Sequence, residues 1–273
     1  MLGMWDSGFG GMTVVSAIQK QLPELSFIYR ADHKNAPYGG RSPEEILELV
    51  TAEMNVMFQA GCTLILLACN TASASALRDM QQNWLPHAWP GRNIIGVVVP
   101  VVEETIAMMP YLSVQPAAPI VHVFATDHTV RSQVFVTEIY KHAPGVRVVQ
   151  TACSALAPAI DSGASYEELH KIVDQYVQVA KSNSPKVDYV ILGCTHYPLV
   201  REMFADDFPD VPILDQAAAV AHKLESYLQR HPEYQMDFTG QRKFTTTGDI
   251  AIINQAAHAR LQQLELQNEF KAA

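Results

Sequence analysis

The sequence predicts an α/β fold with mostly parallel strands, on two observations. Apolar runs of strand length alternate along the chain with amphipathic segments of helix length, which is typical of strands joined by helical crossovers. The chain has 273 residues, of which 48% are hydrophobic and 17% charged, so it can bury one large core or two small ones. This composition excludes disorder as the dominant state.

Periodicity predicts the individual elements in order. The first part of the chain should hold a strand at 27–31, a helix at 43–60 and a buried strand at 63–68. The middle should hold strands at 94–99, 120–125 and 146–151, and helices at 129–140 and 166–181. The last part should hold strands at 187–192, 211–214 and 242–246, and helices from about Leu199, at 217–230 and after Asp249 as N-cap.

Two proline-containing stretches, 81–93 and 111–119, lack clear periodicity and are predicted to be loops on either side of the strand at 94–99. We therefore expect a change of domain near residue 95. Periodicity alone leaves open which half the tail of the chain completes.

Charge and hydropathy exclude several classes of partner. The formal net charge is −9 and no block of Lys or Arg occurs, so nothing favours nucleic acid. The longest apolar run, 94–102, contains Gly96 and Pro100 and falls short of the ~20 residues that span a bilayer. A Gly-rich turn near the N-terminus leaves no room for a signal peptide. We expect a cytoplasmic protein that binds no nucleic acid and no membrane.

The four cysteines do not form a structural set. None is spaced as Cys-x-x-Cys, and four in 273 residues are too few for a disulfide scaffold, so free thiols are expected. The sequence also contains no cluster with metal-ligand spacing and nothing that indicates a pyridoxal site. We expect neither a metal nor a cofactor.

Three strand ends carry polar groups, and functional groups of open α/β sheets gather at such ends. The first is the Gly-rich turn 6–11, which also fits a simple tight turn capped by Asp6. The second and third resemble each other: an apolar strand is followed by a small residue, a cysteine and then a threonine, at Cys69 and again at Cys194. This internal repeat suggests two related halves that face each other.

A pair of equivalent thiols constrains the chemistry. Nucleophilic catalysis needs one activated cysteine with a base, and a second equivalent thiol adds nothing to it. Inversion of a stereocentre needs two acid/base groups on opposite faces of one carbon, and Cys69 and Cys194 suit those roles. Asp6 and His196 could then adjust the thiols, although a histidine so close to a cysteine is more often a surface residue. For Cys62 and Cys153 we expect inert packing.

At these positions the chain resembles the glutamate racemases, the cofactor-independent two-cysteine enzymes of the aspartate/glutamate racemase superfamily. The resemblance runs nearly end to end, and its motifs lie at 6–11, 29–32, 35–42, 68–73, 96–100, 125–130, 193–199, 214–215 and 246–249. The two cysteine motifs together are specific. His196 indicates the glutamate branch, because the aspartate branch carries a Cys-Thr-Glu motif there.

The resemblance implies a site and an activity. It implies that Cys69 and Cys194 are the two bases and that Asp6 and His196 assist them. It implies that the substrate is glutamate, interconverted between its L and D forms by proton transfer at Cα, and that D-glutamate supplies peptidoglycan synthesis. The residues implied to hold the substrate are Ser7, Pro37, Tyr38, Gly39, Asn70, Thr71, Thr129 and Thr195.

The resemblance further implies two pseudo-symmetric, three-layer α/β domains with the active site in the cleft between them. The first domain would comprise 1–95 plus 212–273, with Asp6 and Cys69. The second would comprise 96–211, with Cys194 and His196. A homodimer is one oligomeric state to consider.

Some positions depart from the family pattern. Asp127 and His128 precede Thr129 where a glycine is usual, and Asp161 aligns with a position that is usually Glu. These departures leave three alternatives open. One is a racemase for another amino acid such as aspartate, the second is an amidohydrolase that uses Cys194 with His196, and the third is an amino-acid-binding protein without turnover.

Overall fold

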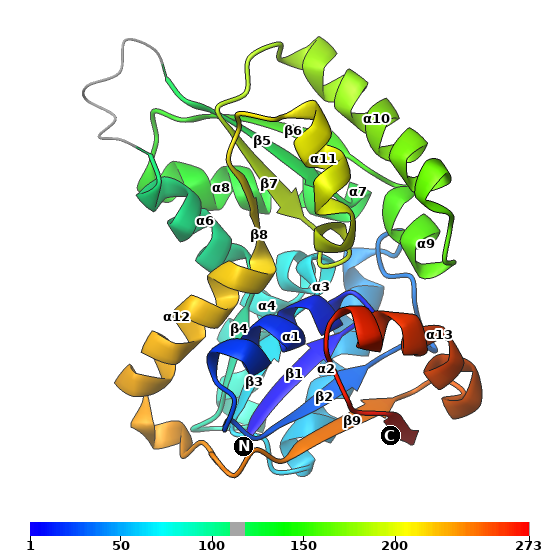
Figure 1. Ribbon diagram of the computed structural model, residues 1–273. Coiled ribbons are helices and arrows are strands. Elements are labelled where there is room, and N and C mark those ends of the chain that lie inside the picture. The colour runs from blue at the N-terminus through cyan, green and yellow to red at the C-terminus, as the bar shows by residue number, and fades with distance from the viewer. Residues whose placement is uncertain (110–117, 273) are drawn as a thin grey trace.

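The computed structural model describes residues 1–109 and 118–272, so the expected loop at 111–119 lies mostly outside the described residues. Figure 1 shows two sheets, one above the other, with helices on both faces of each. Every strand pairing in the two sheets is parallel among the described residues. The expected α/β class is confirmed.

The first sheet has the strand order β10-β9-β2-β1-β3-β4. Its strands are β1 (Leu2–Asp6), β2 (Phe27–Ala31), β3 (Leu64–Leu67), β4 (Asn93–Gly96), β9 (Arg242–Thr246) and β10 (Phe270–Ala272). The tail of the chain thus adds two strands beside β2, which answers the question that periodicity left open.

The second sheet has the order β6-β5-β7-β8. Its strands are β5 (Ile120–Ala125), β6 (Arg147–Ala152), β7 (Tyr189–Gly193) and β8 (Ile213–Asp215). The order β2-β1-β3-β4 in the first sheet matches the order β6-β5-β7-β8 in the second. If the four strands of each set are numbered as they occur along the chain, both sets have the spatial order 2-1-3-4. The cysteine motifs follow the third strand of each set, so the repeat in sequence is also a repeat in topology.

Each sheet separates two apolar layers, because side chains along a strand alternate between its faces. In β3, Leu64 and Leu66 enter one core while Ile65 and Leu67 enter the other. In β7, Val190 and Leu192 face one core of the second sheet, and the remaining apolar side chains face its other core. The sequences of both strands are apolar throughout since both faces are covered.

The helices cover these faces, and Figure 1 shows α12 running along the side of the molecule where the two sheets meet. The α-helices are α1 (Gly11–Gln21), α2 (Pro43–Gln59), α3 (Asn70–Ser75), α4 (Leu77–Asp79), α5 (Leu85–Ala88), α6 (Val98–Ala107), α7 (Asp127–Ser132), α8 (Val134–His142), α9 (Leu156–Asp161), α10 (Tyr166–Asn183), α11 (Arg201–Asp207), α12 (Gln216–Arg230) and α13 (Ile250–Gln263). A π-helical turn, η1 (Met80–Trp84), and two 3-10 turns, η3 (Tyr197–Val200) and η4 (Pro232–Tyr234), complete them. No helix in the described ranges has the length and hydropathy needed to cross a bilayer.

The sequence-based expectations failed around the first sheet's last strand. The expected loop at 81–93 is helical as far as Ala88, because Trp84 and Trp89 stack on Phe58 at 6.3 and 5.4 Å between ring centroids. Pro86 occurs in the first turn of α5, where proline is tolerated. The expected strand at 94–99 ends at Gly96 and α6 follows, since a short apolar run does not distinguish a strand from a buried helix.

Two other boundaries differ. The expected helix at 129–140 is divided into α7 and α8 at Gln133, whose φ of +57° interrupts helical geometry. β8 pairs with β7, so the second sheet extends to Asp215, beyond the expected division at residue 212.

Candidate active site

A cavity of about 210 Å³ opens where the carboxyl ends of the strands of both sheets meet. Both Cys69 and Cys194 line it. Of the twelve catalytic and substrate-binding residues expected from the sequence, ten line this cavity, and so do Asp127 and Asp161, two of the departures from the family pattern. The ten are Ser7, Pro37, Tyr38, Gly39, Cys69, Asn70, Thr71, Cys194, Thr195 and His196. Asp6 and Thr129, which are fully buried, do not belong to the cavity wall among the described residues.

Cys69 ends the loop after β3 and immediately precedes α3. Its Sγ lies 3.4 Å from the Ser7 hydroxyl, and only 6% of the residue is exposed. Burial, and next the charge of Asp6, raise the pKa of the Cys69 thiol to about 12, although the Ser7 hydrogen bond opposes the shift. Cys69 is therefore a protonated thiol at neutral pH.

Cys194 follows β7 and belongs to a relay of three side chains. Its Sγ lies 3.6 Å from Nδ1 of His196, and Nε2 of His196 lies 3.0 and 3.1 Å from the two carboxylate oxygens of Asp161. Burial alone would lower the pKa of His196, but Asp161 outweighs it and holds that pKa well above its usual value. The imidazolium form can donate to the carboxylate on one side and to sulfur on the other.

Asp161 itself is held ionised. Its burial would raise the pKa of the carboxyl group, yet the opposing effects of His196 and Arg260 bring the pKa below its usual value. The carboxylate therefore remains charged when His196 is charged, and the two groups stabilise one another.

Asp6 ends β1 behind the cavity wall. One carboxylate oxygen accepts the Gly8 backbone N–H at 2.8 Å and the other accepts the Thr195 hydroxyl at 3.3 Å. Burial raises the pKa of Asp6 above its ordinary value. Asp6 thus acts on Cys69 through its charge, while its hydrogen bond reaches the residue beside Cys194.

The Gly-rich turn allows the two halves to approach closely. A Cβ at Gly10 would lie 2.5 Å from Nδ1 of His196 and would also overlap the Thr195 hydroxyl. Only glycine fits there without moving the histidine. The turn is therefore shaped by the opposite wall of the cavity, beyond what a simple capped turn requires.

The substrate-binding residues expected from the sequence form two groups. Asn70 and Thr71 begin α3, and the Thr71 hydroxyl lies 3.1 Å from that of Thr126. Thr126 caps α7 and lines the cavity, whereas Thr129 stands behind it with its hydroxyl 3.0 Å from that of Thr126. Thr126 and the neighbouring Asp127 therefore line the cavity from this strand end, and Thr129 does not.

Pro37, Tyr38 and Gly39 form the second group, in the loop between β2 and α2. The Tyr38 hydroxyl donates to a carboxylate oxygen of Asp32 at 2.6 Å. The Thr247 hydroxyl donates to the other oxygen of Asp32, also at 2.6 Å. Asp32 thereby fastens this loop to the end of β9.

Sequence reasoning missed Gln216, the first residue of α12. It is fully buried, and its side-chain amide donates to Oδ1 of Asn70 at 3.2 Å. The amide nitrogen of Asn70 has no hydrogen-bond partner within the part of the chain that the structure describes. Gln216 therefore orients Asn70 so that this donor is available. The rule that functional groups follow strands would have found Gln216, because it comes directly after β8.

The other two cysteines lie in apolar cores. Cys62 belongs to the core between the first sheet and α2, and Cys153 to a core of the second sheet. Burial raises the pKa of Cys62 to about 11 and that of Cys153 further, so both remain thiols. Their interpretation as packing residues agrees with this burial.

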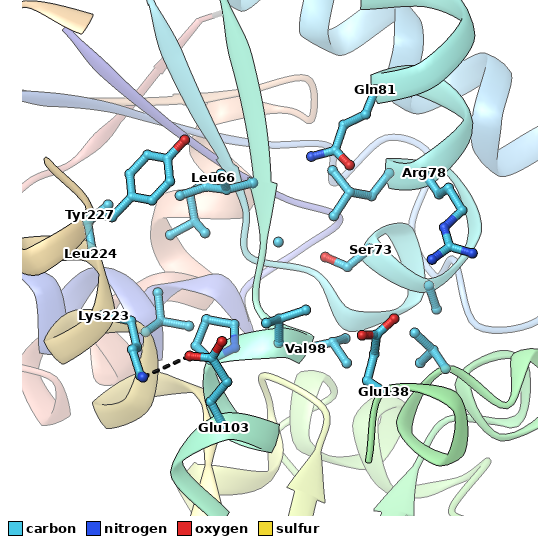
Figure 2. A pocket seen from close by; sticks show the side chains of 18 of the residues that line it. Leu66, Ser73, Arg78, Gln81, Val98, Glu103, Glu138, Lys223, Leu224 and Tyr227 are labelled. Atoms are coloured by element: carbon cyan, nitrogen blue, oxygen red, sulfur yellow. Dashed lines mark ion pairs between the residues drawn. The ribbon is translucent and has the colours of Figure 1, made fainter. Parts of the chain in front are cut away.

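A larger cavity of about 570 Å³ lies elsewhere between the halves, against β4, α6 and α12 (Figure 2). Figure 2 shows Lys223 and Glu103 paired at its edge, at 2.7 Å, with Tyr227 and Arg78 on opposite sides. No Cys, His or Asp lines it among the described residues. The two candidate thiols, Cys69 and Cys194, line the smaller cavity, so the candidate active site is assigned there despite the larger volume of this one.

Comparisons with known proteins agree with one another. A family model described as Asp/Glu/Hydantoin racemase matches residues 12–224. A glutamate racemase of Phenylobacterium zucineum is 40% identical over 260 residues, 91% of this chain and 92% of its own. A glutamate racemase of Ruegeria pomeroyi is 40% identical over 277 residues, covering 100% of this chain and 99% of its own.

Solved structures give the same picture. Glutamate racemase isoform RacE1 from Bacillus anthracis superposes with a TM-score of 0.85 at 27% identity, covering 100% of this chain and 97% of its own. Glutamate racemase from Francisella tularensis, solved in complex with D-glutamate, superposes with a TM-score of 0.83 at 25% identity, covering 99% and 95%.

Proposed function

Because the chain belongs to the Asp/Glu/hydantoin racemase family, we propose that it interconverts L- and D-glutamate by moving protons between Cα and two thiols, Cys69 and Cys194. One observation carries the proposal. The two thiols follow equivalent strands of two sheets that share one topology, and both line the same cavity. A carbon held between them can be approached from opposite faces.

The reaction is a pair of proton transfers. One cysteine, as thiolate, takes the α-proton and becomes a thiol, and the electron pair of the broken C–H bond remains on the substrate as a carbanion. The other cysteine, as thiol, donates its proton to the opposite face and becomes a thiolate. The configuration inverts, and the two cysteines exchange roles for the reverse reaction.

The two thiols have different surroundings, which affect their protonation in different ways. His196, held charged by Asp161, stabilises the thiolate of Cys194 and returns a proton to it. Burial and Asp6 raise the pKa of Cys69, so that its protein surroundings alone favour the protonated thiol. A substrate ammonium group beside Cys69 opposes that effect, so glutamate itself favours the Cys69 thiolate.

We propose that the substrate is held by groups from both halves. Ser7, Asn70, Thr71, Thr195 and the loop at 37–39 provide donors and backbone groups around the cavity. Thr126 takes the position for which Thr129 was expected, and Thr129 supports it. We propose that the chain divides into two domains. The first comprises residues 1–95 and the tail after β8, and the second comprises the middle of the chain up to and including β8.

The cellular role follows from the product. We propose that D-glutamate made by this chain supplies peptidoglycan synthesis and that the reaction takes place in the cytoplasm, where the four free thiols stay reduced. We also propose a homodimer, which a measurement of the molecular mass in solution would test.

The relay Asp161–His196–Cys194 also favours a second candidate, a cysteine amidohydrolase. In such an enzyme a carboxylate orients a histidine that activates one thiol, which is the arrangement seen here. That scheme gives Cys69 no role, however, although Cys69 lines the same cavity. Racemisation accounts for both thiols.

The test measures exchange at Cα in deuterated water by NMR, with L- and D-glutamate and L- and D-aspartate as substrates. We expect deuterium to enter glutamate with inversion and without hydrolysis. Cys69→Ser and Cys194→Ser should each lower racemisation by at least about a thousandfold, because a serine hydroxyl is far less acidic than a thiol.

Cys62→Ala is the matched control, since Cys62 is a buried thiol outside the cavity, and it should retain activity. Near wild-type turnover in either cavity variant would overturn the two-thiol mechanism. Release of an amide or acid with no exchange at Cα would favour the amidohydrolase, whereas exchange of aspartate alone would favour a paralogue. Binding without any exchange would identify an amino-acid-binding protein.

A further inference from the structure

The last long helix reaches across to the wall of the candidate active site. Arg260 lies on α13, which packs on a core of the first sheet, while α9 packs on a core of the second. Nη2 of Arg260 donates to the backbone carbonyl oxygens of Ile160 at 2.6 Å and Asp161 at 2.9 Å, the last two residues of α9. Figure 1 shows α13 directly below α9. Arg260 therefore joins the two halves beside the cavity.

The side chain of Arg260 is held in place on several sides. It is only 12% exposed, and its Nη1 donates to the carbonyl of Ala256 at 2.7 Å within α13. Its Cζ lies 4.7 Å from the centroid of the Phe9 ring, a cation–π contact. Phe9 belongs to the same turn as Ser7, which touches Cys69. The guanidinium is thus fixed between the turn near one thiol and the helix that carries Asp161.

The position of the charge has a physical consequence. The last carbonyl groups of a helix lack partners within the helix and carry partial negative charge, so a cation there stabilises the helix end. The carbonyl of Ile160 also accepts the Gly163 backbone N–H at 3.1 Å, so Arg260 is its second donor. The same Nη2 lies 3.9 Å from Oδ1 of Asp161, which is 3.0 Å from Nε2 of His196, while Oδ2 lies 3.1 Å from the same nitrogen. The guanidinium therefore restrains both the backbone of Asp161 and the direction of its carboxylate.

We propose that Arg260 is a positioning residue for the racemisation: it holds the end of α9 so that Asp161 remains aligned with His196 and, through it, with Cys194. This inference rests on the proposed function. It assigns to the tail of the chain a role beyond completing the first sheet, because Arg260 on α13 contacts Asp161, the outermost residue of the relay, from the other half of the molecule.

Four groups face or influence the carboxylate of Asp161. His196, Arg260 and His33 lower its pKa, and burial opposes them. Asp6 carries a further nearby carboxyl group, whose pKa Asp161 raises in turn. Burial lowers the pKa of His33 to about 4, so the His33 ring is neutral at neutral pH. The permanent charge in this set is that of Arg260.

The experiment uses the full chain with Arg260→Met, which keeps much of the side-chain volume but removes the charge and the donors. We expect kcat to fall about ten- to a hundredfold with little change in KM, since the relay loses alignment while the binding groups remain. The acid limb of the kcat/KM profile should move to higher pH, because Asp161 without its cation is protonated at higher pH.

Arg260→Lys separates charge from geometry and also serves if Arg260→Met does not fold. It should keep the acid limb near its wild-type position yet recover kcat only in part, because an ammonium group cannot donate in the planar arrangement of a guanidinium. Arg242→Met is the matched control: Arg242 also stacks on a ring, that of Phe27 at 5.8 Å, and donates to the carbonyl of Pro23, away from the cavity. It should leave kcat and the pH profile unchanged.

The inference is overturned if Arg260→Met keeps both kcat and the acid limb, or if Arg242→Met has the same effect. It is also overturned if Arg260→Lys folds and racemises at the wild-type rate. These results are distinct from a failure of the proposed function, in which the wild-type chain itself would not exchange the α-proton of glutamate.

Discussion

The charge of His196 depends on its two neighbours, Asp161 and Cys194, and it in turn affects the proton affinity of the Cys194 thiol. Asp161 holds the imidazolium in place, while Cys194 receives its influence through the contact of 3.6 Å. Gly10 leaves the space in which the ring lies. The chemistry of one thiol is therefore set by residues from three separate segments.

Asp161→Asn should lower the pKa of His196, because burial is then no longer outweighed by a carboxylate. We expect the basic limb of the kcat/KM profile to move to lower pH and kcat at neutral pH to fall by about tenfold or more. An NMR titration of labelled histidine would follow the ring directly. An unchanged titration of His196 would contradict this prediction.

Asp206→Asn is the control for Asp161→Asn, because it removes the carboxylate from an exposed His–Asp pair, that of His170 at 3.8 Å. Exposed pairs of this kind interact weakly, so activity and its pH dependence should not change.

The buried pair of His196 and Asp161 also contributes to the stability of the fold. The folded-state pKa of His196 lies above its ordinary 6.5 and that of Asp161 lies below its ordinary 3.8. The contribution is therefore fully present between these two ordinary values, and it is lost as the pH rises through the folded value of His196 or falls through that of Asp161.

At the scale of elements, most helices and strands were predictable and their junctions were not. The strands at β2, β3, β5 and β7 agree with apolar runs in the sequence, and α10 agrees with its amphipathic period. α6 was missed since its Val-rich start reads equally as a strand. The division at Gln133 depends on one residue with positive φ, which periodicity does not report.

One contact between elements leads to a prediction. The amide of Gln216 connects the beginning of α12 with Asn70 at the beginning of α3, at 3.2 Å. Gln216→Leu should raise KM for glutamate about tenfold with a smaller effect on kcat, because Asn70 loses its orientation and a buried hydrogen bond costs about 1–3 kcal/mol when one partner is removed.

Steady-state kinetics with both enantiomers would check the effect of Gln216→Leu. Gln178→Leu is the control, since Gln178 is an exposed glutamine whose side-chain amide donates to Asp174 on the same helix, α10. A KM for Gln216→Leu equal to that of the control would show that Asn70 needs no such support.

At the scale of the whole molecule, the cavity belongs to both halves. Hydrogen bonds join the two halves at and behind its wall, between Thr71 and Thr126 and between Thr195 and Asp6, and Ser75 and His128 are also in contact. A ligand held there contacts both sheets' strand ends at once. Binding should therefore stabilise the molecule as a unit.

Glutamate at about 100 times its Kd should raise the midpoint of thermal unfolding by about 5 °C, since such binding is worth about 2.7 kcal/mol. Cys194→Ser should show a similar shift, because it removes a proton carrier while the binding groups stay. Calorimetry would record both. Two separate transitions, only one of which moves with glutamate, would contradict binding between the halves.

The sequence by itself determined the fold class, the repeat and the two thiols, because these depend on local periodicity and on the order of residues after a strand. Tertiary structure alone decided which contacts between distant residues hold the groups around those thiols in place. Asp161, Gln216 and Arg260 lie 35, 146 and 99 residues from the partners His196, Asn70 and Asp161 that they contact. No local pattern encodes such contacts. They arise only when parallel strands bring their carboxyl ends together and the tail returns to the first sheet.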